Sequence, residues 1–223
     1  MSRETESMET IDTTTEFNEK QVAIITAAEK LISTDGFAGT SVRDIAHEAG
    51  VNVAMISYYF GSKEKLLEAI FEYRTSIMRI KVENLIQNEH LTHIEKVNVL
   101  IDDYVEKFMH QQDFHKIVIR EQLIERDTVI ASLILELKKR NLVSIKKLIS
   151  DGQKAGAFKK NIDVGLMLST MVGTVSHMIS SNKFYREINH LEHLTEEEFQ
   201  KHMKKKLSFH LKNLFKLVLT YES

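Results

Sequence analysis

The 223-residue sequence has no cysteine, no proline and no tryptophan, and only eight glycines. The absence of cysteine excludes disulfides, thiolate metal ligands and cysteine nucleophiles. Because proline and glycine are the usual turn formers, their scarcity favours helices throughout. No apolar run approaches the eighteen or so residues of a membrane span, and the N-terminus lacks the apolar core of a signal peptide. We therefore expect an all-α protein of the cytoplasm that has no contact with a membrane.

The composition also limits the chemistry. Hydrophobic residues make up 43% and charged residues 28%, as in an ordinary globular protein, and the formal net charge is −2. Such a charge argues against a protein that coats nucleic acid nonspecifically. The chain lacks a glycine-rich phosphate loop, a nucleophile elbow and a paired-carboxylate motif, so we expect neither an enzyme nor a cofactor. His90/His93 and His190/His193 are spaced like metal ligands, but no third ligand accompanies them, and we expect no metal site.

The segment 40–65 has the pattern of two short helices joined by a tight turn. Ser41 and Asp44 form a capping box at the start of the first helix. Apolar residues then recur at helical spacing until Gly50, where a left-handed residue can end a helix. Asn52 is a good cap for the second helix. This is a helix-turn-helix, whose second helix is expected to lie in the DNA major groove.

The outward positions of the second helix suit contacts with DNA. Val53 and Ala54 are small enough to approach base edges and to touch thymine methyl groups. Tyr58 and Tyr59 offer hydroxyl groups to phosphates. Lys63 lies in the first turn of the following helix, where the helix N-terminus already favours an anion. We expect bases to be read by the first pair and phosphates to be held by the others.

The same residues carry a family resemblance. The chain from Ala27 to Leu66, with TSVRDIA at 40–46 and YFGSKEKL at 59–66, closely resembles the DNA-binding region of tetracycline-repressor (TetR) family regulators. The resemblance implies an all-helical homodimer that represses promoters and is released by a small molecule. The residues that match the family's DNA-contacting positions are Thr40, Ser41, Arg43, Asn52, Val53, Ala54, Ser57, Tyr58, Tyr59 and Lys63. Val53 replaces a commonly polar or basic residue and Ser57 a commonly aromatic one, which bears on the DNA sequence preferred.

The chain divides into three regions. Residues 1–16 are rich in serine, threonine and glutamate, which predicts a disordered tail. Residues 17–64 are expected to form the helix-turn-helix DNA-binding domain, and residues 65–223 an effector-binding and dimerisation domain. The amphipathic segments that predict helices of this second domain begin near residues 63, 95, 114, 127, 163 and 195.

Methionine and aromatic residues in the second domain indicate a small-molecule effector that is largely apolar, because methionine adapts to varied apolar ligands. The same residues would fill a core equally well, so membership of a pocket is open for each. The candidate effector-binding residues are Tyr104, Phe108, Met109, Gln122, Met171, Thr174 and His177.

Two helices are candidates for pairing with a second copy of the chain. Gly165, Ser169, Gly173 and Ser176 form a stripe of small residues that permits close helix approach. The last helix has an apolar stripe of its own, formed by Met203, Leu207, Leu211 and Leu214. We expect the two helices and their copies to form a four-helix interface, since two recognition helices are normally needed to read a palindrome. The alternative is that both pack inside one subunit.

Together these patterns predict a DNA-binding transcriptional regulator with double-stranded DNA, a second copy of itself and a small-molecule effector as partners. The predicted mechanism is release of a repressor from a palindromic operator when the effector binds. Two alternatives stay open. One is a DNA-binding regulator on the same fold that needs no effector, and the other is a helical protein-interaction module.

Overall fold

The computed structural model describes residues 17–124 and 128–221, except for the side chains of 122–124. The predicted tail, 1–16, lies outside the described residues. Within them the chain forms ten helices and no strand, which confirms the all-α prediction. The helices are α1 (Glu19–Gly39), α2 (Val42–Glu48), α3 (Val53–Phe60), α4 (Lys63–Gln87), α5 (His93–His110), α6 (Gln112–Ile124), α7 (Val129–Lys154), α8 (Val164–Ser180), α9 (Asn182–Ile188) and α10 (Glu196–Leu219).

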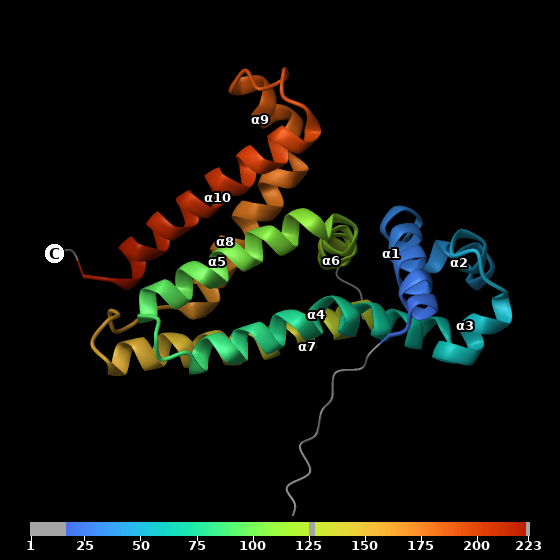
Figure 1. Cartoon of the computed structure of the whole chain (residues 1–223), viewed down its shortest axis with the longest axis horizontal. Helices are drawn as coiled ribbons and strands as arrows, with labels where there is room; N and C mark the ends of the chain where they lie inside the picture. The colour runs from blue at the N-terminus through green and yellow to red at the C-terminus, as the bar shows by residue number, and fades with distance from the viewer. Residues whose placement is uncertain (1–16, 125–127, 222–223) are drawn as a thin grey trace, which may run out of the picture.

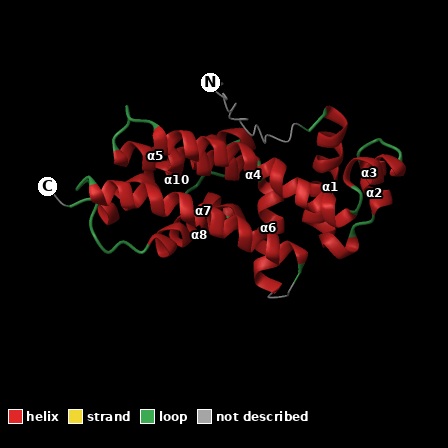
Figure 2. Cartoon of the chain, turned by 90° about the horizontal axis from the view of Figure 1, so that it is seen from below, coloured by secondary structure: helices red, strands yellow, loops and turns green. Residues whose placement is uncertain are grey.

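The helices form a small head and a larger body (Figure 1). The head consists of α1, α2 and α3 at one end of the molecule. From the head α4 runs the length of the body beside α7, while α5 packs against α8 and α10. Both views place α6 between α1 and the rest of the body (Figure 2), and α6 packs against α1, α5 and α7. No single helix among the described residues is long and apolar enough to cross a membrane; only α8 and α9 together, bent by 76°, match a span in length and composition.

Side-chain caps fix where several helices begin. Ser41 accepts a hydrogen bond from the backbone N–H of Asp44, and the Asp44 carboxylate accepts one from the backbone N–H of Ser41. Hydrogen bonds from the Ser41 side chain and backbone hold the pKa of Asp44 below its usual value. Thr195 and Glu198 form the same capping box on α10. The box at Ser41 was predicted from the sequence.

The apolar side chains gather into two cores. The head core contains Ile24 and Ile45 with other residues of α1 to α4, and it extends into the body through Ile130 of α7. The body core lies between α5, α7, α8 and α10, and the far end of α4 reaches it through Leu85. Because α4 contributes to both cores, the head and the body are not separately packed units.

Helix α6 also belongs to both cores, through two consecutive residues. Phe114 is buried in the head core, where its ring lies 5.0 Å from that of Phe71. The next residue, His115, stacks on Phe108 of the body core, with ring centroids 3.6 Å apart and planes inclined by 11°. A movement of α6 therefore changes the packing of both cores at once.

The structure corrects part of the predicted dimer interface. Met203, Leu207 and Leu211 are at most 4% exposed and lie in the body core of their own subunit. They are covered because α10 packs along α5, where ion pairs join Asp102 to Lys212 and Glu106 to Lys204. Because they are buried, these three side chains cannot contact a second copy of the chain. Leu214 is half-buried, and the short helix α9 was not predicted.

A tight turn closes the end of α7. The backbone N–H groups of Ala157 and Phe158 donate to the Gly152 carbonyl, at 2.9 and 3.2 Å. The chain thereby folds the buried Phe158 ring over Gly152, and a Cβ atom on Gly152 would lie 2.3 Å from Cδ2 of that ring. Only glycine leaves room for the ring, so this close approach fixes the residue type.

We predict that Gly152→Ala destabilises the protein by about 1–3 kcal/mol, because the added methyl group overpacks a filled core. Thermal or urea unfolding measures the difference. Gly39→Ala is the matched control, since a Cβ there would lie 3.6 Å from Asp35, an ordinary contact. Equal stabilities of the two variants would contradict the close approach.

Candidate DNA-binding surface and effector site

The helix-turn-helix presents one face of α3 outward. Ile56 and Phe60 point into the head core, whereas Tyr58 is 82% exposed and Val53 40% exposed. The predicted contacts Ser41, Arg43, Asn52, Ala54 and Ser57 are exposed as well, and Tyr59 is half-buried. Most of the predicted DNA-contacting side chains are therefore accessible on the head.

Asn52 prepares the start of this helix. Its Oδ1 accepts a hydrogen bond of 2.8 Å from the backbone N–H of Ala54. The oxygen is used inside the protein, so the amide NH₂ is the group that remains to donate outward. The cap thus fixes α3 and leaves a donor at its N-terminus, which suits a phosphate.

Two predicted contacts have structural roles instead. Thr40 is 3% exposed and its hydroxyl donates to the Gly36 carbonyl at 2.9 Å, so its side chain cannot reach DNA, contrary to prediction. The Lys63 ammonium donates to the carbonyls of Phe37 and Thr40, at 2.7 and 2.9 Å, and lies 4.2 Å from the centre of the Phe37 ring. Lys63 therefore ties the α1–α2 connection to α4, and its third proton is left for another acceptor.

Polar contacts fix the head on the body. Arg74 of α4 donates two hydrogen bonds to the Glu29 carboxylate of α1, at 2.6 and 3.1 Å. Glu29 is 5% exposed, and burial raises its pKa although the Arg74 hydrogen bonds act in the opposite direction. Arg120 of α6 donates to the Thr34 carbonyl at 3.1 Å. Both α4 and α6 therefore hold α1 directly.

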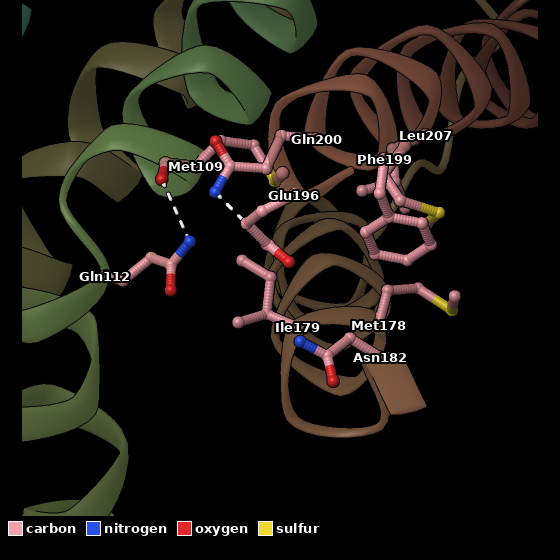
Figure 3. Close-up of a pocket in the computed structure, with 10 residues that line it drawn as sticks. Met109, Gln112, Met178, Ile179, Asn182, Glu196, Phe199, Gln200 and Leu207 are labelled. Atoms are coloured by element: carbon pink, nitrogen blue, oxygen red, sulfur yellow. Dashed lines mark hydrogen bonds between the residues drawn. The ribbon is translucent and has the colours of Figure 1, made fainter. Parts of the chain in front are cut away.

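The body contains a cavity of about 20 Å³ between the α5–α6 corner and α8, α9 and α10 (Figure 3). Met109 and Gln112 line one side, and Gln112 donates a 3.3 Å hydrogen bond to the Met109 carbonyl. The opposite side is formed by Met178, Ile179, Asn182, Glu196, Phe199, Gln200, Met203 and Leu207. The volume holds about one water molecule. At this corner the body has no room for a larger ligand in this conformation.

The predicted effector residues that the structure describes do not gather at this cavity. Met109 lines it. Phe108 and Met171 are buried in the body core, and the Tyr104 ring packs 5.7 Å from that of Phe108, where burial raises the pKa of Tyr104. Thr174 is half-buried.

Two further effector predictions have different outcomes. His177 is exposed on the surface of α8, so it is not the buried pocket residue that its apolar helix suggested. The side chain of Gln122 lies outside the described residues.

The sequence did not reveal a row of polar residues at the α5–α6 corner. Lys107, Gln111 and His115 follow one another at intervals of four, across the break between the helices. Gln111 Oε1 and His115 Nε2 are enclosed and have no hydrogen-bond partner among the described residues. Burial lowers the pKa of Lys107 to about 8 and that of His115 to about 3. No group of three or more potential metal ligands occurs in the described part of the chain.

We predict that Lys63→Ala lowers the free energy of unfolding by about 2 kcal/mol, because two charge-assisted hydrogen bonds to carbonyls are lost. Thermal unfolding in the absence of DNA measures this effect. Lys65→Ala is the control: Lys65 is exposed and its one ion pair among the described residues is with Glu68, so we expect a change of less than about 0.5 kcal/mol. A Lys63 variant as stable as the control would leave DNA contact as the sole role of Lys63.

Comparison with known proteins agrees with this architecture. Residues 24–70 match the profile of "Bacterial regulatory proteins, tetR family", and residues 94–208 that of "Tetracyclin repressor-like, C-terminal domain". The chain is 26% identical over 162 residues to the Fatty acid metabolism regulator protein of Bacillus subtilis, covering 73% of this chain and 82% of that protein. It is 30% identical over 135 residues to the probable regulator YttP of the same species, covering 59% and 63%.

Solved structures share the fold. The fatty acid degradation regulator FadR from Bacillus halodurans superimposes with a TM-score of 0.63 at 22% identity, over 88% of this chain and 96% of that one. FadR from Bacillus subtilis, solved with stearoyl-CoA, gives 0.60 at 22% identity, over 85% and 96%. The ketosteroid regulator KstR2 of Mycobacterium tuberculosis gives 0.66 at 18% identity, over 93% and 98%. With both profiles matched in order over most of its length, the chain belongs to the TetR family of DNA-binding transcriptional regulators.

Proposed function

We propose that the protein is a homodimeric repressor that binds a palindromic operator in the cytoplasm and leaves it when an effector enters the body. Residues 17–64 are the DNA-binding part, and residues 65–223 bind the effector and the second copy. The observation that carries the proposal is the outward face of α3, which is exposed although the rest of the head is packed and braced. No catalytic step is part of this function.

The exposed side chains divide the work of DNA binding. Val53 and Ala54 are placed to read bases, because small apolar groups can approach thymine methyls. Arg43, Tyr58 and the Asn52 amide are placed to hold phosphates, which position the protein without reading sequence. Since the net charge is −2, affinity rests on these few contacts rather than on a basic surface.

The outer faces of α8 and α10 are the proposed dimer interface. The small residues Gly165, Ser169 and Gly173 are exposed in the single chain, and a Cβ atom on Gly173 would meet no other atom within 4 Å. Large apolar side chains lie exposed on the same two helices, with Leu166 at 67%, and Phe209 of α10 also at 67%. A second copy would cover these side chains, and the small residues would let the helices approach closely.

The effector is proposed to be a long-chain acyl compound. The relatives include regulators of fatty acid metabolism, one of them solved with stearoyl-CoA. The methionine-rich lining of the cavity suits a flexible apolar chain. Binding would favour an open body and shift α6, which shares a core with the head, so the two α3 helices would lose the spacing that two successive major grooves require. The small cavity volume favours one alternative, a regulator of the same fold without an effector.

We predict that substitutions on α2 and α3 separate specificity from affinity. Selection from a randomised DNA duplex library should return a palindrome for the wild type. Ala54→Gln should change the preferred bases, because a longer polar side chain meets the base edges. Arg43→Ala should weaken binding to all duplexes alike and flatten its salt dependence.

Fluorescence anisotropy on the selected duplex and its single-base variants measures both effects. Glu83→Ala on α4, which changes an exposed charge outside the proposed DNA surface, is the control. Failure of the wild type to enrich any duplex would favour the protein-interaction module instead.

We predict that Gly173→Trp yields a monomer, because the indole prevents close approach of the two α8 helices, while a Cβ atom at this exposed position meets no other atom within 4 Å in the single chain. Analytical ultracentrifugation should give one chain mass, against two for the wild type. Val143→Trp is the matched control on α7, where Val143 is already 69% exposed, and it should stay dimeric. A dimeric Gly173 variant would place the interface elsewhere.

A further inference from the structure

A second hollow lies where the head meets α7, and we call it the junction cleft. Its volume is about 520 Å³, and it shares no lining residue with the small cavity of the body. Sites for small molecules in proteins usually measure about 300–1,000 Å³. The junction cleft therefore has room for a small-molecule ligand as it stands, without any opening of the fold.

Helical spacing explains how the chain forms the cleft. Four lining residues of α4 follow one another at i, i+3, i+4 and i+7, so they share one face of that helix: Lys65, Glu68, Ala69 and Glu72. Three lining residues of α7 are spaced in the same way: Leu133, Glu136 and Arg140. Ala69 lies in the middle of the α4 face, where its methyl group leaves space that a longer side chain would fill.

Aromatic rings form the apolar part of the lining. They belong to Phe17, Tyr59 and Phe60 of the head and to Phe71 of α4. The Phe17 ring packs edge to face on Tyr73, with ring centroids 5.8 Å apart, and the Tyr59 ring lies 6.3 Å from that of Phe60. Because these rings are held by their neighbours, the aromatic wall is preformed. Such a wall can bury an apolar ligand, and ring faces attract cations.

The charges that line the cleft have a negative excess. Its carboxylates are those of Glu68, Glu72 and Glu136, and its cations are Lys65 and Arg140. The Lys65 ammonium donates to Glu68 at 2.7 Å, so these two charges compensate each other.

The other two carboxylates are only partly compensated from outside the cleft. Glu72 accepts one hydrogen bond from Arg79 at 3.2 Å, and Glu136 accepts one from Lys139 at 2.9 Å. Each of these bonds uses a single oxygen, and a carboxylate can accept more. Both pairs are also accessible to water, which makes their attraction weak. A positively charged ligand would gain from both carboxylates.

We propose that the junction cleft is a binding site for a bulky apolar cation, such as a quaternary ammonium or phosphonium compound. Its apolar groups would lie against the aromatic wall, and its charge would face Glu72 and Glu136. This site is separate from the proposed acyl effector site and does not depend on operator release. Phe71 lines the cleft and packs on Phe114 of α6, so an occupant would contact the head, α7 and the ring that supports α6.

Calorimetric titration without DNA tests the site with two probes of the same shape and opposite charge, tetraphenylphosphonium and tetraphenylborate. We expect the wild type to bind the phosphonium at least about tenfold more tightly, because the negative excess of the lining attracts one probe and repels the other. In Ala69→Leu the Kd for the phosphonium should rise at least about tenfold, because the leucine side chain fills the middle of the cleft.

Glu136→Lys tests the charge without changing the shape of the apolar lining. The Glu136 side chain is 63% exposed, so this variant keeps the fold even if Ala69→Leu does not. Its Kd for the phosphonium should also rise at least about tenfold. Glu83→Lys is the matched control: it makes the same charge reversal at an exposed position of α4, about 16 Å along the helix from Glu72, and should bind like the wild type.

Three results would overturn the site. The first is a wild type that does not bind the phosphonium, and the second is one that binds the borate equally or more tightly. The third is a phosphonium Kd that Glu136→Lys changes no more than Glu83→Lys does, since the probe would then bind elsewhere on the molecule.

Discussion

The structure depends on a constraint at two consecutive residues of α6. Phe114 packs against Phe71 in the head core, and His115 stacks on Phe108 in the body core. Neighbouring residues of a helix point about 100° apart, so α6 can satisfy both cores only in one orientation. Protein interiors are close-packed and repack between discrete arrangements rather than deforming continuously. The packing of the head core and that of the body core therefore both depend on the position of α6.

Polar contacts fix the position of α1 relative to the body. The Arg74–Glu29 pair joins α4 to α1, and Arg120 joins α6 to the carbonyl of Thr34 near the end of the same helix. Apolar packing alone would let α1 slide, whereas hydrogen bonds lose their strength when distance or angle changes. Because Glu29 is buried, its carboxylate needs Arg74 in place. The head is thus held to the body by these two contacts and follows their movement.

Local sequence patterns were sufficient to predict the helices of the helix-turn-helix. The contacts that each helix face makes depend on residues distant in sequence, and these could not be predicted. The capping box at Ser41 and the helical spacing after it predicted the helix-turn-helix, because all the contacts involved lie within a few residues. The stripe of Met203, Leu207 and Leu211 looks the same whether it faces its own α5 or a second copy, and the prediction chose the wrong partner. Lys63 binds backbone carbonyls, which have no sequence signature. The row from Lys107 to His115 crosses a helix break at Gln111, where a periodicity search stops.

The small volume of the body cavity has a kinetic consequence. A space of about 20 Å³ is too small for a long acyl chain, so a ligand of that kind that binds at this corner would have to wait for α8 and α10 to part from α5. Association would then proceed through a minor open population, and its observed rate would level off at high ligand concentration, at the rate of opening. The rate of opening would thereby limit how fast the protein responds to the effector. The affinity would separately set the effector concentration at which it responds.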